Sequence, residues 1–155
     1  MTASKTRSND FKKTRRKAFA AVALWGLLLA VLSLEPDWVL ESILPIDESH
    51  ADLFYSLFHV TCYGILGFLL CLFFRFKKTL FALRMTDPVV FAAALTVAVV
   101  WGGAIEWAQV YSPTRIPDWV DFGANVLGAL GGLTAFGLWN SSKALPHKDI
   151  SRDRR

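Results

Sequence analysis

The sequence predicts an all-α integral membrane protein, a four-helix transmembrane bundle with both termini on the cytoplasmic side. Apolar residues make up 54% of the 155-residue chain, and the mean hydropathy is +0.37, which is above the range typical of soluble proteins. Four apolar runs lie at 18–34, 53–74, 88–110 and 119–139, and each contains at most one Asp, Glu, Lys or Arg. Each run is long enough to cross a hydrocarbon core about 30 Å thick.

The distribution of positive charge supports four crossings. Of the 17 Lys and Arg residues, seven lie in 1–17, four in 75–87 and five in 140–155, whereas the connection 35–52 is acidic and has none. Positive charge near helix ends marks the cytoplasmic side, so the three basic segments share that side only if the chain crosses four times. We therefore expect 1–17 and 140–155 to be disordered basic cytoplasmic tails that flank one transmembrane domain, 18–139.

The basic tails could indicate a nucleic-acid partner, but their position beside membrane helices favours anionic lipid headgroups. We therefore expect membrane lipids as partners and no nucleic acid.

A basic segment before an apolar run could also be a cleaved signal peptide, with Val31 and Ser33 as small residues at the cleavage site. The run 18–34 is somewhat long for that role, and the sequence favours an uncleaved anchor.

No motif indicates a metal or cofactor site. Cys62 and Cys71 both fall within the second apolar run, and there is no Cys-x-x-Cys pair or Cys/His spacing of a metal site. Loops that cradle phosphate and the sequence signatures of common hydrolases are missing too. We expect no metal and no cofactor.

Polar residues recur at helical spacing within the last three runs, so each run presents them on one face. At about 1.5 Å of rise per residue, the central ones lie roughly 6–9 Å below the outer surface. Together with Arg115 in the connection above them, they are the predicted ligand-binding residues. These are His59, Tyr63, Glu106, Gln109, Arg115, Asp118, Asp121 and Asn125.

Two interpretations of this polar group stay open. An isolated carboxylate in a membrane is costly, so Glu106 should be protonated, in contact with water, or paired with His59 or Arg115. The group is then either a polar lock between helices or a pocket, open to the outer face, that binds a polar ligand.

Asp118 also stands where it could cap the fourth helix. His50 is a weaker candidate than His59 for the histidine of this polar group.

The same residues carry a family resemblance. The segment His59-Val60-Thr61-Cys62-Tyr63-Gly64-Ile65-Leu66-Gly67 resembles the H-x-x-x-Y-x-x-L-G segment of VanZ-like membrane proteins. Further along, E-x-x-Q at Glu106, P-x-R at Pro113 and D-x-x-x-N-x-x-G at Asp121 resemble that family's motifs in the same order. The resemblance runs from about residue 50 to 137.

The resemblance implies a bacterial cytoplasmic (inner) membrane and a site formed by these motifs. Founding members of the family are associated with resistance to the glycopeptide teicoplanin, so it also implies a link to glycopeptide susceptibility. One departure stands out, because the family often has an Asp-Lys pair one turn before its histidine, whereas this chain has Tyr55 and Ser56.

The leading functional hypothesis is a non-enzymatic envelope protein that binds a lipid-linked or amphiphilic molecule near the outer face. The alternative is a membrane-embedded hydrolase or transferase acting on an envelope lipid. In that case His59 would be the general base, with Glu106 or Asp121 as the orienting or acid group. Proton relay is disfavoured because the inner halves of the predicted helices offer no continuing polar path.

The fourth run also carries a stripe of small residues. Ala124, Gly128 and Gly132 repeat every four positions, a pattern that lets another helix approach closely. The partner helix could belong to the same chain or to a second copy, so the sequence allows a homo-oligomer through Gly128 and Gly132.

Overall fold

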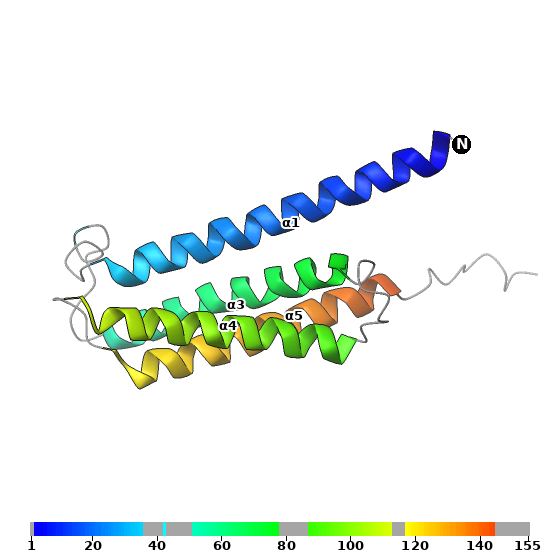
Figure 1. Ribbon diagram of the computed structural model, residues 1–155. Coiled ribbons are helices and arrows are strands. Elements are labelled where there is room, and N and C mark those ends of the chain that lie inside the picture. Colours follow the sequence, from blue (N-terminus) through cyan, green and yellow to red (C-terminus); the bar gives the residue numbers. More distant parts are fainter. Residues whose placement is uncertain (1, 36–41, 43–50, 78–86, 113–116, 145–155) are drawn as a thin grey trace, which may run out of the picture.

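The computed structural model describes residues 2–35, 42, 51–77, 87–112 and 117–144. Four long helices dominate this part of the chain, and within it no strand is found (Figure 1). They are α1 (Thr2–Leu34), α3 (Ala51–Lys77), α4 (Asp87–Gln109) and α5 (Trp119–Ala144).

Each of the four helices is long and apolar enough to cross a membrane. The apolar stretches are Lys12–Leu34, Leu53–Arg75, Pro88–Gln109 and Trp119–Ser142. They agree with the four predicted runs to within a few residues, except at the start of the first. The prediction of an all-helical chain with four helices of this kind is thus confirmed for the described residues.

The expectation of a disordered N-terminal tail was wrong. Helix α1 begins at Thr2, about four turns before the apolar run starts. Lys and Arg have good helix propensity, and extending an existing helix avoids the cost of nucleation, so a basic segment continues the helix readily. The expected C-terminal tail lies mostly outside the described residues.

The helices run antiparallel in succession, so the start of α1, the end of α3, the start of α4 and the end of α5 point toward the same end of the molecule, with the start of α1 projecting beyond the others (Figure 1). Ring contacts confirm this arrangement. The Phe19 and Phe73 rings are 6.0 Å apart, the Phe91 and Phe136 rings are 6.3 Å apart, and the Arg75 guanidinium lies 5.9 Å from the Trp139 ring.

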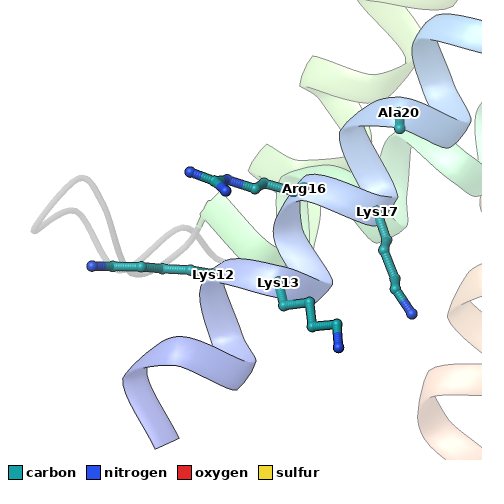
Figure 2. A pocket seen from close by; sticks show the side chains of 5 residues that line it. All are labelled: Lys12, Lys13, Arg16, Lys17 and Ala20. Carbon is teal, nitrogen blue, oxygen red and sulfur yellow. The ribbon is translucent and has the colours of Figure 1, made fainter. Parts of the chain in front are cut away.

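This end of the molecule carries positive charge, and we call it the basic end. Lys12, Lys13, Arg16 and Lys17 project from α1, with Lys12 and Arg16 pointing one way and Lys13 and Lys17 another (Figure 2). A surface hollow of about 550 Å³ between these side chains is lined by α1 alone. It is therefore a feature of one exposed helix rather than a cavity in the bundle.

Helices α3 and α5 make the closest contact in the bundle. A methyl group added at Gly67 would lie 2.6 Å from the backbone oxygen of Ala129. A methyl at Gly128 would collide with the Val60 carbonyl, and one at Gly132 with the Gly64 carbonyl. The small-residue stripe of α5 thus packs against α3 of the same chain, while a homo-oligomer stays an untested prediction.

Most of the core lies between α3, α4 and α5, and several of its residues are small. Ala94 and Ala98 of α4 and Ala129 of α5 are almost completely buried, as are Tyr63 and Cys71 of α3. The three alanines let the helix backbones approach one another, which is how membrane helices gain van der Waals contact.

Helix α1 packs on the outside of this three-helix unit (Figure 1). Leu29 is its most buried side chain, whereas Phe19, Leu24 and Leu27 are largely exposed. Two hydrogen bonds attach it: Trp25 Nε1 donates to the Cys62 carbonyl over 2.9 Å, and Gln109 Nε2 of α4 donates to the Ser33 carbonyl over 3.0 Å.

We predict that Gly132→Ala lowers the thermal unfolding temperature of the purified protein in detergent. The added methyl meets backbone atoms of α3 that cannot move independently, and overpacking of this kind costs about 1–3 kcal/mol. Gly131→Ala is the matched control, because nothing lies within 4 Å of its added methyl. The control should keep or slightly raise stability, since Ala is favoured over Gly in helices. Equal effects of the two substitutions would contradict the proposed α3–α5 contact.

Candidate functional site

Polar side chains from α3, α4 and α5 meet at the end of the bundle opposite the basic end. We call it the polar end. His59 lies two turns into α3, Glu106 lies in the last turn of α4, and Asn125 lies in the second turn of α5. The close approach of α3 and α5 brings the side chains of His59 and Asn125 into direct contact.

His59 uses both ring nitrogens in contacts with α5. Its Nδ1 lies 2.8 Å from Asn125 Oδ1, so the tautomer with a proton on Nδ1 donates a hydrogen bond to that oxygen. Its Nε2 lies 3.7 Å from Asp121 Oδ2. That second contact becomes an ion pair when the ring is doubly protonated, and His59 then carries a positive charge between two α5 side chains.

Glu106 is a buried carboxyl group that is only partly satisfied. The residue is 8% exposed, and its Oε2 accepts the backbone N–H of Asp118 over a long 3.3 Å. Its Oε1 is buried, and among the described residues it has no hydrogen-bond partner. A buried carboxyl oxygen without a hydrogen-bond donor is costly, so a ligand that donates a hydrogen bond to Oε1 would remove this cost.

Two more buried polar atoms lie close to Gly102 of α4. The hydroxyl of Tyr63 and Nδ2 of Asn125 are each 3.4 Å from the position that a Gly102 methyl would take. Neither atom has a hydrogen-bond partner among the described residues. A methyl at Gly102 would also lie 3.2 Å from Tyr63 Cε1, so the glycine leaves room for polar atoms from α3 and α5 to face the same surface of α4.

Asp118 and Asp121 occupy the start of α5. Asp118 Oδ1 accepts the backbone N–H of Val120 over 2.8 Å, which is the hydrogen bond of a helix N-cap. Asp121, in the first turn, lies at the positive end of the helix dipole and faces His59. The expectation that Asp118 caps the fourth helix is therefore confirmed, and Asp121 belongs to the polar group.

The structure separates Gln109 from the rest of the predicted site. Its side chain is buried and donates to the Ser33 carbonyl, so it joins α4 to α1 instead of facing His59. Arg115 and His50 lie outside the described residues. The described site thus contains His59, Tyr63, Glu106, Asp118, Asp121 and Asn125.

A cavity of about 310 Å³ between α4 and α5 adds residues that the sequence did not single out. Glu106 and Asp118 line it together with aromatic and small residues, which are Gly103, Trp107, Val110, Pro117, Trp119 and Phe122. Trp107 and Trp119 are 66% and 85% exposed. Tryptophans near helix ends were a usable signal, since such residues favour the membrane interface.

At the polar end, His59 links two helices, whereas Glu106 keeps a polar atom without a hydrogen-bond partner among the described residues. The contacts between His59 and α5 fix α3 against α5 and leave neither ring nitrogen directed at the cavity. Glu106, by contrast, lines the cavity and keeps an unpartnered oxygen. Among the described residues, no three potential ligands are grouped so that they could hold a metal ion.

In comparisons with family models, curated proteins and solved structures, no match to this chain was found. The resemblance to VanZ-like proteins therefore stays a prediction that rests on the motifs in the sequence.

We predict that Asp118→Ala lowers the free energy of unfolding by about 1 kcal/mol, because α5 loses its N-cap. Asp118→Asn keeps an oxygen that accepts the Val120 N–H and should retain nearly all of the stability. Thermal unfolding of both variants in the same detergent measures the difference. If Asn is as destabilising as Ala, the contribution of Asp118 depends on its charge and not on the cap.

Proposed function

We propose that this chain is a multi-pass protein of a bacterial cytoplasmic membrane that binds a lipid-linked or amphiphilic envelope molecule. Both termini lie on the cytoplasmic side, and the polar end faces outward. The charges support this orientation, because positive side chains near helix ends mark the cytoplasmic side. At the basic end these are Lys12, Lys13, Arg16 and Lys17. The motifs shared with VanZ-like proteins support the bacterial envelope as the setting.

One observation carries the proposal of a binding site. Beside an apolar cavity at the polar end, Glu106 is buried, has an unpartnered oxygen and contributes to the cavity lining. Pockets for small molecules are typically apolar with a few polar groups, and charged residues within membrane helices commonly mark a functional site. The cavity lies at the end of the helices, where the headgroup of a membrane amphiphile would reach it.

The geometry favours binding over hydrolysis or group transfer. A general base needs a nitrogen or oxygen within reach of the proton that it removes. Both nitrogens of His59 face side chains of α5, and His59 does not line the cavity. The enzyme hypothesis therefore has no observation in its favour among the described residues.

The proposed orientation predicts which positions react with a membrane-impermeant thiol reagent in intact cells. Tyr111→Cys, beyond the end of α4, should be labelled from outside, whereas Lys13→Cys should be labelled only after the membrane is permeabilised. Both native cysteines are buried, which keeps the background low. The reversed pattern, with labelling of residue 13 alone, would overturn the orientation.

The proposed site predicts that the protein retains a specific amphiphile through purification. Native mass spectrometry of wild type should show that species bound, and the double variant Glu106→Gln, Arg115→Ala should lose it. Thr134→Val is the matched control, because Thr134 is exposed on α5 and its hydroxyl bonds only to the Leu130 carbonyl of its own helix. Unchanged lipid content together with a lower unfolding temperature of the double variant would mean that the polar residues only hold the helices together.

A further inference from the structure

We propose that the cavity between α4 and α5 binds an ammonium group with N–H donors that forms part of the headgroup of a membrane amphiphile. The inference rests on the proposed binding function and names the ligand class for the cavity lined by Glu106. Three features carry it: the charges in the lining, an unpartnered carboxyl oxygen and the aromatic residues beside it.

The charged groups in the cavity lining favour a cation. Among the described residues that line it, the ionisable ones are Glu106 and Asp118, and both are acidic. Asp121 lies close enough to Glu106 to add to the negative potential, and its Oδ2 lies 3.7 Å from His59 Nε2. Ionised carboxyl groups at Glu106 and Asp118 would repel an anionic headgroup in this cavity, whereas an ammonium group would pair with them.

The hydrogen bonds of Glu106 favour a ligand that donates N–H groups. Its Oε2 has one long bond to a backbone amide, and its Oε1 has none among the described residues. A primary ammonium group has three donors, so it can supply both charge and hydrogen bonds to this carboxylate. A quaternary ammonium group supplies charge alone and should bind less well.

Aromatic residues complete the description of the cavity. The Trp119 and Phe122 rings meet edge to face with centroids 6.1 Å apart, and both residues line the cavity with Trp107. Aromatic faces attract ammonium groups, and tryptophan does so most strongly. The exposed tryptophans also provide an apolar surface for the first methylenes of an amphiphile.

The size of the cavity fits a headgroup rather than a whole lipid. Its volume of about 310 Å³ is at the lower limit for small-molecule pockets. The acyl chains of the ligand would therefore stay outside, along the exposed surface of α4 and α5. This arrangement predicts that affinity depends on both the amine and the chains.

The test measures binding of defined lipids to the purified full-length protein in detergent by native mass spectrometry. Short-chain phosphatidylethanolamine should bind at least about 10-fold more tightly than phosphatidylglycerol or phosphatidylcholine of the same chain length, which corresponds to about 1.4 kcal/mol. Free ethanolamine should bind far more weakly than the lipid, and equal binding would overturn the amphiphile as the source of the ammonium group.

The variants locate the site. Glu106→Gln keeps the shape of the side chain and should remove most of the preference for phosphatidylethanolamine, and Asp118→Asn should reduce it while the N-cap is kept. Thr134→Val should preserve it. If Glu106→Gln fails to fold, Trp107→Leu provides a second variant that leaves the buried carboxylate intact and should still weaken binding.

The outcomes separate this inference from the proposed function. Tight binding of phosphatidylglycerol that is lost in Arg115→Gln would overturn the ammonium ligand and keep an amphiphile site. A preference for phosphatidylethanolamine that survives both Glu106→Gln and Trp107→Leu would overturn the location. If wild type bound no lipid above the level of the double variant, the proposed function itself would fail.

Discussion

The close approach of α3 and α5 is the constraint on which the rest of the structure depends. Gly64 and Gly67 of α3 and Gly128 and Gly132 of α5 let the two backbones nearly touch. The same register places His59, one residue before Val60, opposite Asn125, three residues before Gly128. Because these glycines have no side chain, the two backbones gain close van der Waals contact, which is the main source of attraction between helices that cross a membrane.

The number and type of helices could be predicted from the sequence because hydropathy reports directly on the length of an apolar run. The start of α1 could not, since hydropathy falls at Lys17 whereas the helix backbone continues through Lys and Arg residues. Helical spacing also predicted that polar residues of α3 and α5 share a site, and the contact between His59 and Asn125 confirms their proximity.

Gln109 and the α4–α5 cavity show where a pattern in one helix stops being informative. Gln109 lies one turn from Glu106, yet its amide bonds to α1, because the direction of a side chain at a helix end depends on which neighbour offers an acceptor. The cavity beside Trp119 arises from the space left between two packed helices. Neither the neighbour nor the space is encoded in local periodicity, so both required the tertiary structure.

The attachment of α1 has a consequence for how the sequence can vary. In two hydrogen bonds between α1 and the other described helices, a side chain donates to a backbone carbonyl: Trp25 to that of Cys62, and Gln109 to that of Ser33. Any residue at 62 or 33 supplies the same acceptor, whereas only a residue with a donor of matching length can replace Trp25 or Gln109. These two hydrogen bonds therefore restrict the identity of the donor residues 25 and 109, whereas the acceptor residues 62 and 33 are restricted only by packing.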